Sequence, residues 1–141
     1  MKEKKEDLDK VGKSEKETSK KVLIADDDNE ARAFLKYVLS REDYDVVEVK
    51  DGKSLVEAAP KEKPDIIISD IVMPGLSGWR ATKKIRELPS LKNTPIIYYS
   101  SLLKDFELYD ILKPAGPSAF VFKPFQAKEM LGIIKKLLEE K

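Results

Sequence analysis

The chain has 141 residues and 41% of them are hydrophobic, which is enough to bury the core of one domain of ordinary size. Its 27 basic and 26 acidic side chains give a net charge of +1, which excludes binding to nucleic acid or an anionic membrane by bulk charge alone. Cysteine is absent, so disulfides and thiolate metal sites are excluded. No apolar run approaches the roughly 18 residues of a membrane helix, and the first 20 residues lack the apolar stretch of a signal peptide. We therefore expect a cytoplasmic protein.

Residues 1–20 differ in composition from the rest of the chain. They hold seven lysines and six acids, with only Leu8 and Val11 as apolar interior positions. So little apolar surface cannot repay the entropy of ordering the segment. The sequence predicts a flexible charged tail over 1–20, with a frayed helix as the alternative, and one folded domain over 21–141.

The remainder alternates short apolar runs with stretches of helical spacing. The runs typical of buried strands are 21–25, 45–49, 65–69, 94–99 and 119–122. The stretches typical of helices are 29–40, 53–59, 78–88, 102–112 and 126–140. Parallel strands need crossover helices between them, so this alternation predicts a doubly wound α/β domain with a five-stranded parallel sheet.

Polar residues follow four of the five predicted strands. Asp26 and Asp27 follow the first, Asp70 the third, Ser100 the fourth and Lys123 the fifth. The carboxyl ends of parallel strands share one edge of a sheet, where ligands bind at a topological switch point. Carboxylate oxygens suit Mg²⁺, and an ammonium with a hydroxyl suits phosphate oxygens. The pattern predicts a site for a divalent cation and a phosphoryl group.

Each of these residues also has a simpler interpretation. An aspartate after a strand is often a turn residue or a helix N-cap, which is how we interpret Asp28 taken alone. Ser100 alone is more often a cap than a ligand, and Lys123 alone is more often a solvated charge. The combination on four strand ends favours the joint site.

Four segments carry a resemblance to a known family, namely "LIADDD", "SDIVMPGLSG", "YYSS" and "FVFKPF". In this order and spacing, the chain resembles the receiver domain of response regulators in two-component signalling, with the single-domain chemotaxis type as its simplest form. The resemblance covers 21–141. It implies a flavodoxin-like (βα)5 fold with Asp70 as phosphoacceptor.

The resemblance also implies a Mg²⁺ site. Asp27, Asp70 and the backbone carbonyl of Val72 would ligate the ion, and Asp26 would hold it through water. The ion would also make the adjacent charges of Asp26 and Asp27 tolerable.

The resemblance further implies roles for residues of the last two strands. Ser100 and Lys123 would contact the phosphoryl group, and Ser100 with Phe120 would form a switch. The Lys123–Pro124 bond would be a candidate cis peptide. Phe120 stands where tyrosine is frequent in the family, so the switch would depend on packing rather than on a phenolic hydrogen bond.

Partners follow from the absence of histidine. The chain cannot hold its own phosphohistidine, so a histidine kinase, a phosphotransfer protein or a small donor would supply the phosphoryl group. A downstream protein target or a homodimer partner would bind the face made by helix 102–112, the fifth strand and the last helix. Activity beyond self-phosphorylation and self-dephosphorylation is not expected. The apolar Val72 and Leu102 predict slow loss of phosphate, unless Val72 only packs its loop.

Two other functions fit parts of the pattern. A Mg²⁺-dependent phosphohydrolase places its nucleophile at the end of the first strand with an acid two positions later, as Asp26 and Asp28 do. A pseudo-receiver that serves only as a protein-interaction module is the second alternative. The acidic pair together with Asp70, Ser100 and Lys123 argues against it.

Overall fold

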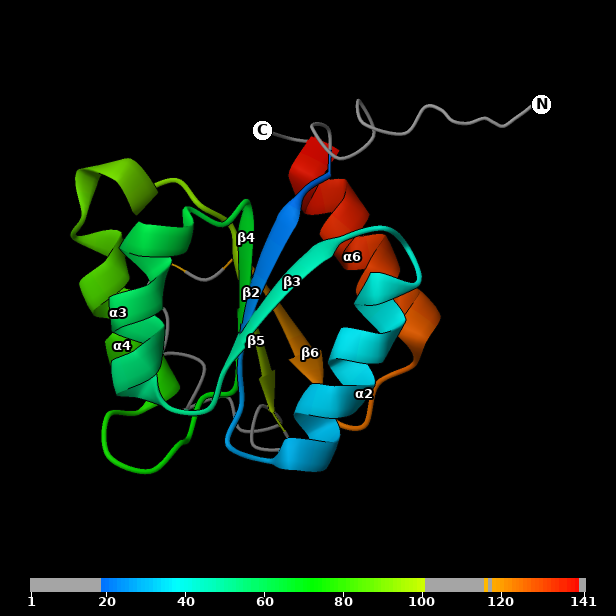
Figure 1. Cartoon of the computed structure of the whole chain (residues 1–141), viewed down its shortest axis with the longest axis horizontal. Coiled ribbons are helices and arrows are strands. Elements are labelled where there is room, and N and C mark those ends of the chain that lie inside the picture. Colours follow the sequence, from blue (N-terminus) through cyan, green and yellow to red (C-terminus); the bar gives the residue numbers. More distant parts are fainter. Residues whose placement is uncertain (1–18, 101–115, 117, 140–141) are drawn as a thin grey trace.

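A five-stranded parallel sheet forms the centre of the molecule in the computed structural model, which describes residues 19–100, 116 and 118–139 (Figure 1). The strands lie in the order β3-β2-β4-β5-β6. Their bounds are β2 Lys21–Ala25, β3 Asp45–Val49, β4 Ile66–Ser69, β5 Ile96–Ser100 and β6 Ala119–Phe122. The predicted doubly wound α/β fold is confirmed.

The order of the strands reverses between β2 and β4. From β2 the chain passes to β3 on one side, then returns to β4 on the other side and continues outward through β5 to β6. Val22 of β2 pairs with Val46 of β3 and with Ile66 of β4. The topological switch point therefore lies at the carboxyl ends of β2 and β4, which are the ends followed by aspartates.

Helices cover both faces of this sheet. Their bounds are α2 Asn29–Ser40, α3 Gly52–Glu62, α4 Gly78–Arg86, the short 3-10 helix η2 Pro89–Leu91, and α6 Ala127–Glu139. Figure 1 shows α3 and α4 on one side of the sheet and α2 and α6 on the other. Each of these four helices buries a pair of residues spaced four apart, which lie on one helical face: Leu35 and Leu39, Leu55 and Ala59, Ala81 and Ile85, Met130 and Ile134.

Side-chain caps define the starts of three helices. Asp28 accepts hydrogen bonds from the backbone N–H groups of Glu30 and Ala31, and so caps α2. Asp51 caps α3, and Ser77 caps α4. Each cap satisfies amides that have no partner within the helix. The simple interpretation of Asp28 is therefore confirmed.

The second predicted helix is longer than expected. The prediction ended it at residue 59, but α3 continues to Glu62 with Pro60 inside it. Pro60 has no N–H to donate to the carbonyl four residues earlier, so it removes one backbone hydrogen bond from the helix. The backbone N–H of Lys63, in the left-handed region with φ of 50°, donates to the Ala59 carbonyl and ends the helix.

Some predictions concern residues outside the described ranges. Residues 1–18 of the predicted tail lie there, and so does the predicted helix 102–112, which includes Leu102 and forms part of the predicted docking face. Within the described residues, no helix has the length and apolar character that a membrane span needs.

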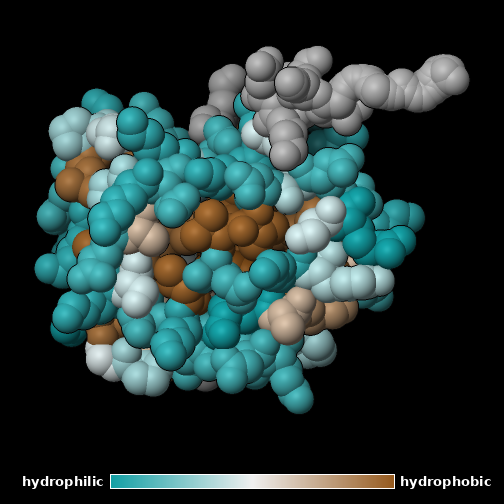
Figure 2. Space-filling model, viewed as in Figure 1, coloured by the Kyte–Doolittle hydropathy of each residue, from teal (hydrophilic) through white to brown (hydrophobic). Residues whose placement is uncertain are grey.

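The edge strand β3 is less covered than the centre of the sheet. Its valines are half-buried, whereas the residues of β4 and β5 are buried. Figure 2 shows apolar surface in the middle of the view, where the edge strand β3 lies. Glu48 lies on this strand, and it pairs with Arg32 at 3.0 Å and Lys36 at 2.9 Å, both on α2. A charge on an edge strand of this kind discourages pairing with another chain.

Candidate functional site

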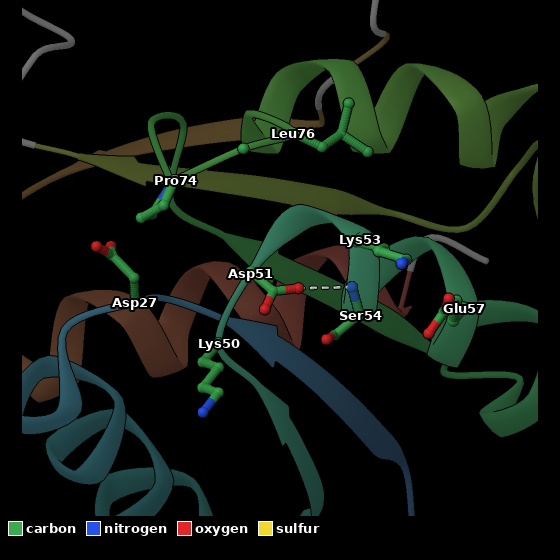
Figure 3. A pocket seen from close by; sticks show the side chains of 9 residues that line it. Asp27, Lys50, Asp51, Lys53, Ser54, Glu57, Pro74 and Leu76 are labelled. Atoms are coloured by element: carbon green, nitrogen blue, oxygen red, sulfur yellow. Dashed lines mark hydrogen bonds between the residues drawn. The ribbon is translucent and has the colours of Figure 1, made fainter.

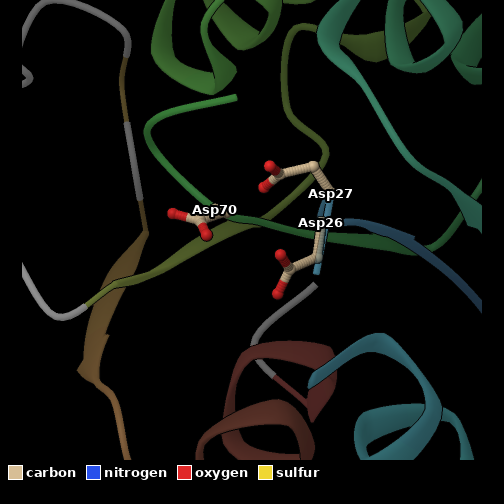
Figure 4. A group of neighbouring side chains, drawn as sticks. All are labelled: Asp26, Asp27 and Asp70. Carbon is tan, nitrogen blue, oxygen red and sulfur yellow. The ribbon is translucent and has the colours of Figure 1, made fainter. Parts of the chain in front are cut away.

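Three aspartates meet at the switch point of the sheet. Asp26 and Asp27 follow β2 and Asp70 follows β4, and their carboxylates approach one another in Figure 4. One oxygen from each lies within 4.8 Å of the others. Asp26 is buried, Asp70 is half-buried and Asp27 is exposed. The fold thus brings together the three acids that the sequence places at these two strand ends.

Hydrogen bonds hold the buried carboxylate of Asp26 in place. Its Oδ1 accepts from the backbone N–H of Asp28 at 2.9 Å. Its Oδ2 accepts from the Tyr99 phenol at 2.5 Å and from Lys123 Nζ at 2.9 Å. A buried charge needs such partners, because burial removes the water that would otherwise stabilise it. The side chain of Asp26 is therefore fixed before any ligand arrives.

Asp70 is held at both of its carboxylate oxygens. Oδ1 accepts from the backbone N–H of Ile71 at 2.7 Å, and more weakly from Val72 at 3.4 Å. Oδ2 accepts from Lys123 Nζ at 2.9 Å. Burial raises the pKa of Asp70, although the charge and hydrogen bond of Lys123 oppose that effect. The carboxylate is oriented, and its negative charge is poorly solvated.

Lys123 joins the two buried acids. Its ammonium lies 2.9 Å from Oδ2 of Asp26 and of Asp70, and 4.4 Å from the centroid of the Tyr99 ring. Burial acts to lower the pKa of Lys123, but the two carboxylates outweigh it and raise that pKa. The backbone N–H of Lys123 donates to the Ser100 carbonyl at 3.2 Å, and the peptide bond to Pro124 is cis as predicted. The hydrogen bond to Ser100 fixes the backbone from which the Lys123 side chain extends.

The other predicted site residues lie around this cluster. Ser100 ends β5 and is 3% exposed. Phe120 on β6 is half-buried and packs against Tyr98, with ring centroids 5.9 Å apart. The Val72 side chain follows Asp70 and is 56% exposed. More than half of the surface of Val72 is therefore open to solvent.

A pocket opens from the exposed acid, Asp27. It runs between the start of α3 and the loop that precedes α4 (Figure 3). Its lining carries both signs of charge: Asp27, Lys50, Asp51, Lys53, Ser54, Glu57, Pro74, Gly75 and Leu76. The backbone N–H of Ser54 donates to Asp51 at 2.7 Å and lowers the pKa of that carboxyl. The pocket leaves the acidic cluster open to solvent on the side of Asp27.

The donor set suits a divalent cation that prefers oxygen. Three carboxylates lie within reach of one another, and no nitrogen or sulfur ligand of a softer metal is among them. Asp27 is the most accessible of the three, while Asp26 already holds two side-chain donors. The residues therefore fit Mg²⁺, with Asp27 and Asp70 better placed for direct contact than Asp26.

Two residues of the site were not predicted from the sequence. Tyr99 contacts both Asp26 and Lys123, although the segment that contains it was interpreted only for Ser100. Arg32 donates to the Asp26 carbonyl at 2.7 Å and anchors the end of β2 to α2. Tyr98 lies outside the acidic cluster, and its ring packs against Phe120. Alternation along β5 places Tyr98 and Tyr99 on opposite faces of the sheet, and this period of two was the available signal.

Comparison with known proteins gives one family. The family model described as "Response regulator receiver domain" matches residues 22–135. The chain is 34% identical over 131 residues to Histidine kinase P4 of Formosa agariphila, covering 91% of this chain and 9% of that protein. It is 32% identical over 121 residues to the alkaline phosphatase synthesis transcriptional regulatory protein PhoP of Bacillus subtilis, covering 85% of this chain and 49% of that protein. The chain thus spans half or less of the length of these relatives.

Solved structures agree with this result. The chemotaxis response regulator CheY4 of Vibrio cholerae superimposes with a TM-score of 0.80 at 29% identity, covering 85% of this chain and 99% of that one. The receiver domain of sensor histidine kinase PA1611 from Pseudomonas aeruginosa gives 0.81 at 25% identity, covering 86% and 99%, and that structure has a magnesium ion coordinated in its active site cleft. Together with the family match and the acidic cluster at the switch point, these similarities show that the chain belongs to the response regulator receiver domains.

Proposed function

We propose that this receiver domain accepts a phosphoryl group on Asp70 in a Mg²⁺-dependent reaction. The observation that carries the proposal is the position of the Asp70 carboxylate, fixed by the Ile71 amide on one oxygen and paired with Lys123 on the other. The donor would be a histidine kinase or a phosphotransfer protein. The resulting conformational change would be read by a protein target or a second copy of the chain.

The residues of the site have distinct tasks in this reaction. An oxygen of Asp70 forms a bond to phosphorus while the bond from phosphorus to the donor breaks, and the electron pair of that bond leaves with the donor. A carboxylate attacks phosphorus slowly mainly because the carboxylate and the phosphoryl oxygens both carry negative charge. Lys123 can offset that charge because its ammonium already contacts Asp70. A Mg²⁺ ion held by Asp27 and Asp70 would supply further neutralisation.

The structure supports a route for the signal away from Asp70. Ser100 and Lys123 are joined through backbone contact at the ends of β5 and β6. Phe120 lies on β6 and packs on Tyr98. A movement of Ser100 or Lys123 toward a phosphoryl group would therefore act on the strand that carries Phe120. We propose Ser100 and Phe120 as the switch residues on this basis.

The phosphohydrolase alternative is disfavoured by two contacts. Asp26, its nucleophile, is 0% exposed and already accepts hydrogen bonds from Tyr99 and Lys123. Asp28, its second acid, caps α2 through Glu30 and Ala31. A nucleophile needs access to its substrate, and a helix cap is committed elsewhere.

Intact-mass analysis after incubation with acetyl phosphate tests the proposed function. We expect one phosphoryl adduct per chain with Mg²⁺, none with EDTA, and none for Asp70→Asn. Asp51→Asn is the matched control, because it removes a carboxylate from the neighbouring pocket and should leave the adduct intact. Release of inorganic phosphate over many turnovers by Asp70→Asn would indicate the phosphohydrolase, and no adduct under any condition would indicate an interaction module.

A further inference from the structure

Tyr99 contacts the site closely but has no role in the proposed phosphoryl transfer. It is 0% exposed and comes from β5. Its hydroxyl donates to Asp26 Oδ2, and its ring lies 4.4 Å from Lys123 Nζ. Phe125 packs on the edge of this ring with centroids 6.0 Å apart. The tyrosine is therefore held in place while it contacts both an acid and the ammonium.

Lys123 has to serve two carboxylates at once. Its ammonium is equally close to Asp26 and to Asp70, at 2.9 Å each. If the ammonium turned toward a phosphoryl group on Asp70, Asp26 would lose one of its hydrogen bonds. A buried carboxylate left short of donors is costly. Some other donor must limit that cost if Lys123 is to be released.

We propose that Tyr99 is a positioning residue that keeps Asp26 satisfied and thereby leaves Lys123 free to serve Asp70. The phenol and the ammonium share the same oxygen of Asp26, so the phenol remains as a donor when the ammonium departs. The face of the Tyr99 ring stabilises the cation beside it. The effect of Tyr99 on phosphoryl transfer rests on the proposed function. Its compensation of the negative charge of Asp26 does not.

The proposal makes two predictions of opposite sign for Tyr99→Phe, which removes only the hydroxyl. The negative charge of Asp26 is then less well compensated, so the site should bind Mg²⁺ about tenfold more tightly, since a hydrogen bond to a charged group is worth at least this much. Lys123 is held more firmly by Asp26, so phosphorylation by acetyl phosphate at saturating Mg²⁺ should slow by a similar factor. A general loosening of the site would instead weaken Mg²⁺ binding and also slow phosphorylation.

Tyr98→Phe is the matched control. Tyr98 is also 0% exposed and its hydroxyl also hydrogen-bonds, but to Thr82 on the opposite face of the sheet. Both variants therefore lose one buried hydroxyl from neighbouring positions of the same strand. We expect Tyr98→Phe to leave the Mg²⁺ affinity and the phosphorylation rate within twofold of the unsubstituted chain.

Calorimetric titration with MgCl₂ and the rate of mass adduct formation give the two readouts. Tighter Mg²⁺ binding with slower phosphorylation for Tyr99→Phe alone supports the proposal. Unchanged or weaker Mg²⁺ binding overturns it, and so does an unchanged phosphorylation rate. If the unsubstituted chain accepts no phosphoryl group, the proposed function fails. The Mg²⁺ titration alone then decides whether the Tyr99 hydroxyl compensates the negative charge of Asp26.

Discussion

Gly78 lies against the backbone carbonyl of Asp70 so closely that a Cβ atom on Gly78 would overlap the carbonyl oxygen. The backbone N–H of Gly78 also donates to the Ile71 carbonyl at 2.7 Å. The start of α4 is thus packed directly beneath the proposed phosphoacceptor. A larger residue at 78 would have to move backbone atoms on both sides of the contact.

Gly78→Ala should therefore damage both the fold and the site. We expect a loss of about 2–3 kcal/mol in the free energy of unfolding, since overpacking against backbone cannot be relieved by a side-chain rotation. Phosphorylation of Asp70 by acetyl phosphate should slow as well, because the carboxylate would be displaced. Urea unfolding and intact-mass kinetics measure the two effects.

Gly132→Ala is the matched control for this substitution. Gly132 lies within α6, is exposed, and has no atom within 4 Å of its added Cβ. Alanine favours a helix interior over glycine by about 1 kcal/mol, so this variant should be slightly more stable. Equal effects of the two substitutions would show that the contact with Asp70 is unimportant.

Tyr98 should make the protein less stable at high pH. It is buried with its hydroxyl on Thr82, and burial raises its pKa to about 12. The unfolded chain loses this proton near pH 10. The stabilisation from Tyr98 is therefore complete below about pH 10 and is lost as the pH rises through about 12, by on the order of 2 kcal/mol. Urea unfolding as a function of pH should show a steeper decline for the unsubstituted chain than for Tyr98→Phe.

The fold was predictable because the sequences of the buried strands are continuous apolar runs. β4, with its sequence IIIS, lies in the middle of the sheet and is buried along its whole length. The five strands and the helix 29–40 were found within two residues of their bounds. The end of α3 was missed because the structure accepts Pro60 in a last turn, which a rule about proline alone cannot anticipate.

The site was predictable only in part. Asp26, Asp27, Asp70 and Lys123 were found because each follows a strand, and strand order brings these ends together. Tyr99 was not found, because an aromatic residue within an apolar strand is normally part of the core. Its hydroxyl reaches Asp26 across 73 positions of sequence. Such a contact depends on the relative positions of β2 and β5, which the sequence pattern does not give.

Lys123→Gln should make stability depend strongly on Mg²⁺. Without the ammonium, Asp26 and Asp70 face each other with their charges unbalanced, and we expect a loss of about 2–3 kcal/mol in EDTA. Added Mg²⁺ should recover more stability than it adds to the unsubstituted chain, because tighter binding to the folded state stabilises more. Lys135→Gln, an exposed change of equal charge on α6, should show neither effect. Urea unfolding with and without Mg²⁺ makes the comparison.

Val72 should control how long the proposed phosphoryl group survives on Asp70. Hydrolysis needs a water molecule in line with the bond between phosphorus and Asp70, and the Val72 side chain follows that residue by two positions. The side chain is 56% exposed, so it is available to occupy the space that such a water would need. An isopropyl group cannot hydrogen-bond the water and excludes it from the line of attack.

Val72→Asn should therefore shorten the lifetime of the phosphorylated chain several-fold, because an amide can hold the water that valine excludes. The measurement is the decay of the mass adduct with Mg²⁺ present after the donor is removed. Val72→Ile keeps the apolar bulk and should leave the decay slow. Rapid decay of the unsubstituted chain, or equal decay of the asparagine and isoleucine variants, would show that exclusion of water by this side chain does not set the lifetime.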